Sequence, residues 1–273
     1  MDFQRLHECL RGDFALLRAA AEASDAKAAV PSCPGWTATD LVRHVVEVYL
    51  HKVECIRLGR FPQPWPPEQQ DPDPFAALDE AFAALEAQFA AHDPADHAAT
   101  WHEPDQTVGF WIRRMAQETV IHRIDAELTA GRAVTPVPAD LALDGIDELL
   151  QLFLAYASVA WLDQISELLA AADERPVLVH ATATGSDPAK SDVPTASARW
   201  LLSAHPTGIV AREITGDAAS EAAAQQAALS VTGTPDAVLR WLWNRQENSP
   251  AADVSGDPLL LAQFHALKVA LTQ

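Results

Sequence analysis

Apolar residues recur every three or four positions from the N-terminus to about residue 172. This period predicts amphipathic helices, because it places the apolar groups on one side of each helix. We expect helices over residues 2–24, 37–58, 74–89 and 110–131, and a further one from about 139 to about 172. Proline-rich segments separate some of these helices, among them the turn 30–36 and the extended connector 59–74.

The pattern changes after residue 172. Short runs of apolar and β-branched residues predict strands at 177–182, 199–203, 208–214, 227–231 and 252–255. Thr234-Pro235 and Asp257-Pro258 each pair an N-cap residue with a first-turn proline, so each starts a helix. We therefore expect an α+β protein. Residues 1–172 would form a helix bundle with an up-down four-helix core plus an extra helix, and residues 175–273 a small α+β domain.

Composition narrows the classes of partner. The 273 residues carry a formal net charge of -19, which opposes binding to nucleic acid or to anionic membranes. We expect no membrane span, because no run of eighteen apolar residues occurs. Three cysteines without a CxxC pair, and an N-terminus without a secretion signal, favour a cytoplasmic protein. There is also no glycine-rich phosphate loop, GxSxG or HExxH motif.

The helix over 110–131 carries the first candidate site. Trp111, Met115, Glu118, His122 and Asp125 follow one another at spacings of four, three, four and three, which places them on one face. Glu118 and His122 interrupt its apolar stripe, and a Glu and a His four apart can share one ion. Taken alone, the pair is more typical of a solvated helix surface than of a metal site.

A second histidine comes from another predicted helix. Thr37 and Asp40 form a capping-box pattern, and His44 falls on the inward face of the helix that they start. A histidine there is commonly a satisfied core residue. His51 cannot easily share an ion with His44, because seven residues rise about 10.5 Å along a helix. Any other ligands to a metal at His44 must therefore come from a different helix.

Two stretches of the sequence resemble a known family. Val30-Pro31-Ser32-Cys33-Pro34-Gly35-Trp36-Thr37, followed by Asp40 to His44, is similar to the N-terminal signature of the mycothiol-dependent maleylpyruvate isomerase family. The run from Arg114 to Glu127 resembles its second signature, and Asp144 to Glu148 a third run. Leu242-Trp243-Asn244-Arg245 resembles a Leu-Trp-Gly-Arg run of the family, with Asn244 in place of glycine.

The resemblance implies a DinB-like metal-binding bundle joined to a sterol-carrier-protein-like domain. It implies that His44, Glu118 and His122 bind zinc or another divalent metal and leave a position open for the thiol cosubstrate mycothiol. The protein would then be a zinc- and mycothiol-dependent isomerase or thiol S-transferase. Its metal-activated thiolate would add to an electrophilic small molecule, with the cis-trans isomerisation of maleylpyruvate as the prototype.

For several other residues the sequence does not decide between a functional and a structural interpretation. Arg245 is a candidate catalytic residue that would hold a substrate carboxylate, and otherwise a surface arginine. Arg113 and Arg114 are similarly open. Asp125 either orients the His122 ring or is a solvated helix residue. Trp36 and Trp111 are interpreted as packing groups.

The sequence leaves a second class of function open. A non-catalytic metal- or small-molecule-binding protein on the same scaffold would have its site closed by a fourth ligand, such as His51 or Cys55, or walled off. The expected partners are a small-molecule thiol and an electrophilic substrate, without nucleic acid or membrane. We expect a monomer or weak homodimer. The sequence indicates neither the second substrate nor which divalent metal is bound.

Overall fold

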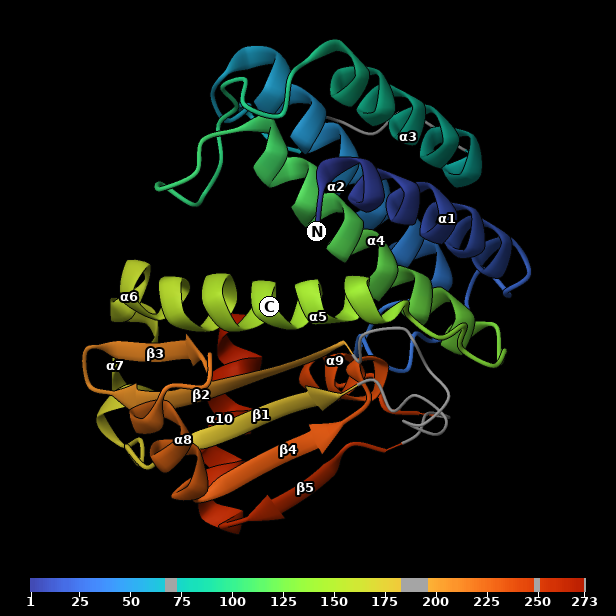
Figure 1. Cartoon of the computed structure of the whole chain (residues 1–273). Helices are drawn as coiled ribbons and strands as arrows, with labels where there is room; N and C mark the ends of the chain where they lie inside the picture. The colour runs from blue at the N-terminus through green and yellow to red at the C-terminus, as the bar shows by residue number, and fades with distance from the viewer. Residues whose placement is uncertain (67–72, 183–195, 248–250, 273) are drawn as a thin grey trace, which may run out of the picture. The chain divides into compact units, whose positions relative to one another are not determined.

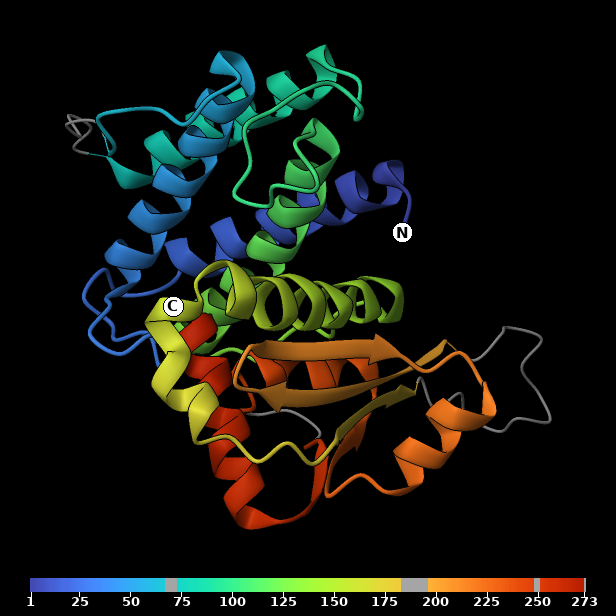
Figure 2. The same ribbon diagram turned by 90° about the vertical axis from the view of Figure 1, so that its left-hand side faces the viewer.

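A computed structural model describes residues 1–66, 73–182, 196–247 and 251–272 of the chain. Contacts within the chain divide it into two compact units, Met1–Thr135 and Pro136–Gln273. The first unit is helical, and the second combines helices with one sheet (Figures 1 and 2). The protein is therefore α+β, as its sequence pattern predicts.

The helices of the first unit begin at side-chain caps. In each, an Asp or Thr side chain accepts a hydrogen bond from a backbone N–H of the first turn, which supplies a partner that the helix itself cannot provide. These helices are α1 (Phe3–Glu22), α2 (Ala38–Leu58), α3 (Pro74–Ala91) and α4 (Val108–Thr129). Residues 67–72 of the predicted connector 59–74 lie outside the described residues.

Helix α4 lies at the centre of this unit. It packs against α1 and α2, and nearly all of its residues from Val108 to Leu128 are buried. Its Arg123 is fully buried and donates through Nε to Asp13 of α1 at 3.0 Å and through Nη1 to Glu127 at 2.8 Å. Because buried charges need opposite charges, this network fixes α1 against α4 at a defined register.

A long, bent helical stretch opens the second unit. It comprises α5 (Ala139–Glu148), the π-helical η1 (Leu149–Tyr156), α6 (Ala157–Ala160) and α7 (Leu162–Ala170). The chain breaks at Trp161, where the backbone leaves the helical region with φ −121°. The sequence grouped this stretch with the bundle and set the boundary between 172 and 175. In the structure η1 packs on strand β3 (Gly208–Glu213) and α5 packs on helix α9 (Pro235–Leu242), so this stretch belongs to the second unit.

The sheet has five strands in the order β3-β2-β1-β4-β5. Strands β1 and β4 are parallel, whereas the other neighbouring pairs are antiparallel. Along β1 buried and half-buried residues alternate, so Val177, Val179 and Ala181 face the core. The strands are β1 (Val177–Thr182), β2 (Ser197–His205), β3 (Gly208–Glu213), β4 (Leu229–Gly233) and β5 (Asp253–Gly256).

Three more helices complete the second unit. The sequence predicts α9 (Pro235–Leu242) and α10 (Pro258–Leu271) from their Thr-Pro and Asp-Pro starts, and both lie behind the sheet in the view of Figure 1. Helix α9 packs against β1 and β4. Helix α8 (Ala218–Gln225) was not predicted; it begins at Asp217, whose side chain accepts hydrogen bonds from two first-turn N–H groups.

Within the described residues, no single helix is long and apolar enough to cross a membrane. One pair of helices in the described part of the chain, Ala139–Ala160 and Leu162–Ala170, bent by 98°, passes that test of length and composition when taken together.

Candidate metal centre

His44 is carried by a rigidly started helix. The Thr37 hydroxyl accepts from the Asp40 N–H at 3.2 Å, while the Asp40 carboxylate accepts from the Thr37 N–H at 2.9 Å. This capping box fixes the first turn of α2, and His44 follows one turn later. Its side chain is 33% exposed, so it is open to a ligand from solvent.

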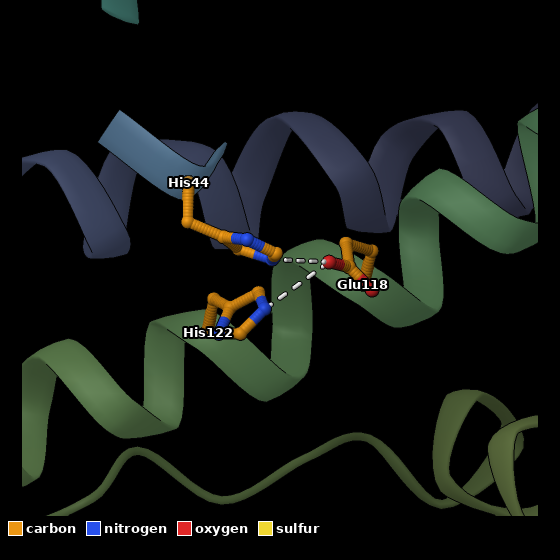
Figure 3. Close-up of side chains that lie close together, drawn as sticks. All are labelled: His44, Glu118 and His122. Carbon is orange, nitrogen blue, oxygen red and sulfur yellow. Dashed lines mark hydrogen bonds and ion pairs between the residues drawn. The ribbon is translucent and has the colours of Figure 1, made fainter. Parts of the chain in front are cut away.

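Glu118 and His122 lie on successive turns of the buried helix α4. Oε1 of Glu118 lies 3.1 Å from Nε2 of His122 and 3.3 Å from Nε2 of His44 (Figure 3). Potential ligand atoms of these three residues all lie within 4.8 Å of one another. The structure therefore brings together the three residues that the sequence singled out, from two helices far apart along the chain.

The charge of Glu118 is balanced on both sides. Its second oxygen, Oε2, accepts a hydrogen bond from the guanidinium of Arg114, which is 5% exposed. Although burial alone would raise it, Arg114 and then His122 hold the pKa of Glu118 well below its usual range. Glu118 is thus a carboxylate, the form that binds metals. Arg114, one of the arginines whose role the sequence left undecided, faces this site.

His122 is oriented from its other ring nitrogen. Nδ1 lies 2.9 Å from Oδ2 of Asp125, a carboxylate that is fully buried. Burial opposes a charged imidazole, but Glu118 and the hydrogen bond to Asp125 together raise the pKa of His122 to about 9 in the metal-free protein. Nε2 therefore faces Glu118 and His44. Of the two interpretations of Asp125 that the sequence allowed, the structure supports the one in which Asp125 orients the His122 ring.

The turn before α2 supplies neighbours that the sequence reasoning did not assign. The Ser32 hydroxyl donates to Oδ1 of Asp125, and Cys33 Sγ lies 3.7 Å from Oδ2. The Trp36 ring lies 4.8 Å from the His44 ring and 6.3 Å from that of His122. Trp36 therefore borders the site, whereas Trp111 is a buried packing group whose indole N–H donates to the Ala99 carbonyl. Only the family signature containing Ser32 gave a signal for this turn.

His51 and Cys55, the candidate fourth ligands, bond elsewhere. Nδ1 of His51 lies 3.2 Å from Lys52 Nζ and 3.5 Å from Cys55 Sγ. Burial lowers the pKa of His51 to about 4 and raises that of Cys55 to about 11. Among the described residues, the cluster that could hold a metal contains only His44, Glu118 and His122.

Arg245 belongs to the second unit, at the end of α9. The Arg245 N–H donates to the Arg240 carbonyl and the Asn244 N–H to the Trp241 carbonyl, the pair of bonds that defines a Schellman C-cap. Asn244 has φ 59°, the left-handed conformation that favours glycine and that Asn tolerates better than most residues. This explains why Asn244 can stand where the family pattern has Gly.

Two buried cations hold the loop that carries Arg245. Arg240 donates through Nε to the Arg245 carbonyl at 2.8 Å and through Nη2 to the Glu247 carbonyl. Lys268 Nζ donates to the Trp241 carbonyl at 2.9 Å and lies 4.2 Å from the centre of the Trp241 ring. Arg240 and Lys268 are 2% and 1% exposed. The Arg245 backbone is thus fixed by the domain core.

The three converging residues fit a divalent metal in their donor chemistry. Two imidazoles and one carboxylate form a common zinc-ligand set for sites that keep a position open. Zinc bonds of about 2.0–2.1 Å place neighbouring ligands of a tetrahedron roughly 3.3 Å apart. The separations of 3.3 and 3.1 Å between the imidazole nitrogens and Oε1 agree with that spacing.

Comparison with known proteins shows which family has this architecture. Residues 7–127 match the family described as the mycothiol maleylpyruvate isomerase N-terminal domain, and residues 140–263 match the MDMPI C-terminal domain. No curated protein matches the sequence significantly. Fold and family domains together define a class of two-part α+β proteins with a helical N-terminal domain. Within that class, the chain belongs to the mycothiol-dependent maleylpyruvate isomerase family.

The fold resembles solved structures of a distant relative. The crystal structure of the mycothiol-dependent maleylpyruvate isomerase aligns with a TM-score of 0.58 at 12% identity, covering 94% of this chain and 95% of that one. A mutant of that isomerase with one histidine replaced by alanine aligns with a TM-score of 0.55 at the same identity and coverage.

Proposed function

We propose that this protein is an enzyme that uses mycothiol, a small thiol, to isomerise an electrophilic small molecule or to transfer the thiol to it. The observation that carries the proposal is the convergence of His44, Glu118 and His122, with their donor atoms within 4.8 Å of one another. Membership of the family supports the thiol and the isomerisation. The donor set supports a divalent metal, and zinc best.

The residues have distinct roles in this proposal. His44, Glu118 and His122 hold the metal, and a bound divalent ion supplies the positive charge that keeps a thiol ionised at neutral pH. Asp125 keeps the proton of His122 on Nδ1, so that Nε2 offers its lone pair to the site. Arg114 neutralises the Glu118 oxygen that faces away from the histidines. The Trp36 ring borders both imidazoles.

We assign substrate binding to Arg245. Its guanidinium suits a carboxylate, which it can bind through two parallel hydrogen bonds. The Schellman turn and the buried Arg240 fix its backbone, so the side chain starts from a defined position. Replacing Arg245 by Lys is therefore expected to raise KM for a carboxylated substrate more than it lowers metal content.

The test measures thiol-dependent turnover in the metal-loaded protein. Mycothiol is mixed with maleylpyruvate, and separately with a generic electrophile; formation of the trans isomer and loss of free thiol are followed. We expect turnover in the natural protein, a loss of at least about 100-fold in Glu118→Gln and His44→Ala, and little change in the control His97→Ala, whose side chain is exposed.

Each outcome separates the two classes of function. Thiol-dependent turnover that disappears with Glu118→Gln supports the enzyme. Metal uptake without turnover of either electrophile contradicts it and favours the non-catalytic binding protein. Turnover that is unaffected by Glu118→Gln contradicts the assigned site.

A further inference from the structure

The turn that precedes α2 is a closed and ordered loop. Its arms are joined by hydrogen bonds from the Val30 N–H to the Trp36 carbonyl at 3.0 Å and from the Ala38 N–H to the Ala28 carbonyl at 2.8 Å. Inside it, the Cys33 N–H donates to the Val30 carbonyl and the Trp36 N–H to the Cys33 carbonyl. A loop closed in this way holds its side chains in fixed directions. We call residues 30–36 the α2 entry loop.

One side chain of this loop reaches the carboxylate behind His122. The Ser32 hydroxyl donates to Oδ1 of Asp125, while Nδ1 of His122 lies 2.9 Å from Oδ2. The two oxygens of Asp125 are thus divided between the loop and the imidazole. Asp125 is fully buried, so its Oδ1 needs a hydrogen-bond donor close by, and the Ser32 hydroxyl is one.

We propose that Ser32 is a positioning residue for His122. Through Asp125, its hydroxyl fixes the carboxylate plane and with it the rotation of the His122 ring, so that Nε2 stays directed at the metal centre. This inference rests on the proposed metal site and deepens it, because it names the group that sets the affinity of that site. Partners behind a metal-binding histidine typically change metal affinity 10–100-fold.

The same loop also borders the other histidine. Trp36 follows Gly35, whose φ of 86° turns the chain back, and its ring lies 4.8 Å from that of His44 at an angle of 51°. Trp36 thus contacts the ligand on α2, while Ser32 acts on the ligand on α4. One short loop therefore sets the relative orientation of ligands from two helices before any metal arrives.

Cys33 does not substitute for Ser32 in this role. Its Sγ lies 3.7 Å from Oδ2 of Asp125, the oxygen already bonded to His122, and a thiol is a weak donor. The Ser32 hydroxyl, a stronger donor than a thiol, is bonded to the other oxygen, Oδ1. Removing that hydroxyl is therefore expected to let the carboxylate rotate.

The test measures metal affinity in the full chain. Metal-free protein is titrated with Zn²⁺ against a chelator, and with Co²⁺ while the visible absorption bands are recorded. We expect Ser32→Ala to bind Zn²⁺ about 10-fold more weakly and to shift the Co²⁺ bands, while Ser32→Thr, which keeps a hydroxyl, binds almost normally. The matched control is Ser24→Ala, whose hydroxyl donates to the Ala20 carbonyl in the same unit.

A double-mutant cycle distinguishes positioning from general stability. In the Asp125→Asn background, Ser32→Ala is expected to cause less than about 2-fold additional loss, because the path through the carboxylate is already altered. If Ser32→Ala does not fold, Ser32→Cys provides a side chain of similar size with a weak donor, and the same loss is expected.

The outcomes for the two proposals are separable. Equal Zn²⁺ affinity in Ser32→Ala and the natural protein overturns the role of Ser32 while leaving the metal site intact. A 10-fold loss that persists undiminished in the Asp125→Asn background also overturns it. Absence of metal binding by the natural protein overturns the proposed metal site itself, and the role of Ser32 with it.

Discussion

The rings of His44 and His122 lie edge to face, with centres 4.8 Å apart and planes at 72°. One oxygen of Glu118 stands between their Nε2 atoms (Figure 3). In the metal-free protein this arrangement is held together by charge, because Glu118 is ionised and His122 retains a proton to high pH. A metal ion entering the cluster must displace that proton.

We therefore predict that metal affinity depends on pH. His122 has a pKa of about 9 when no metal is bound, so below that value a proton competes with the metal for Nε2. The apparent affinity for Zn²⁺ should rise about tenfold per pH unit up to about pH 9 and then level off. Chelator competition across pH 6–9.5 measures this, and calorimetry in two buffers should show about one proton released per ion near pH 7. An affinity that does not change with pH would contradict the assignment of His122 as a ligand.

A second prediction concerns the buried Lys268. Burial lowers the pKa of the Lys268 ammonium from 10.5 to about 7, and the positive charge of the nearby Arg245 contributes to this decrease. Between these values the unfolded chain binds more protons than the folded one, so this group makes stability rise with pH and costs most below pH 7. Lys268→Met should therefore be more stable than the natural protein at pH 6, with the gain shrinking toward pH 10.

Denaturant unfolding at pH 6 and pH 9.5 checks this prediction. Lys27→Met, at an exposed lysine, serves as the control and should change stability little at either pH. A Lys268→Met variant that is less stable than the natural protein at pH 6 would show that the bonds to the Trp241 carbonyl and ring outweigh the burial of the charge.

The third prediction concerns the buried ion network of the first unit. Arg123→Met leaves the buried carboxylates of Asp13 and Glu127 without their arginine, and removing one partner of a buried pair costs about 3–5 kcal/mol of unfolding free energy. Arg18→Met is the matched control, because Arg18 pairs with Asp79 and Glu22 at the surface, where such pairs contribute about 1 kcal/mol or less. Chemical denaturation of both variants measures the difference. Equal losses would mean that Arg123 does not act through its buried charge.

The fourth prediction concerns the turn that precedes Arg245. Because Asn244 has φ 59°, Asn244→Gly should be neutral or slightly stabilising, whereas Asn244→Ala should cost about 1 kcal/mol and Asn244→Val more. Thermal unfolding of the three variants gives the order. If alanine and glycine are equally stable at this position, the left-handed conformation contributes nothing to the turn.

Local pattern predicted most of the elements but not how they group. Asp-Pro and Thr-Pro pairs marked the starts of α3, α9 and α10, because a cap and a fixed φ act within one turn. The sequence pattern grouped the helices after residue 138 with the bundle, whereas the structure places them in the second unit. The period of a helix shows that one of its faces is buried, but it does not show which other element covers that face. Helix α8 has an Ala-rich sequence with little apolar contrast, so it gave no periodic signal.

The candidate site shows a similar division. The four-residue spacing of Glu118 and His122 is local. The pattern of its helix singled out His44, and the resemblance to family signatures joined it to that pair as a metal ligand. Helix α4 is nonetheless buried on nearly every side, so the single inward face inferred from spacing describes only part of its surroundings. The hydrogen bond from Ser32 to Asp125 joins positions far apart in the chain, so no local sequence pattern predicts it.

Helix α4 has both a structural and a chemical role. It forms the packing centre of its unit, and it carries two of the three candidate metal ligands. Substitutions there change folding and chemistry at once, so few can accumulate independently. Descendants of this scaffold that acquire new substrates are expected to vary in their loops and in the C-terminal unit, while α4 stays nearly unchanged.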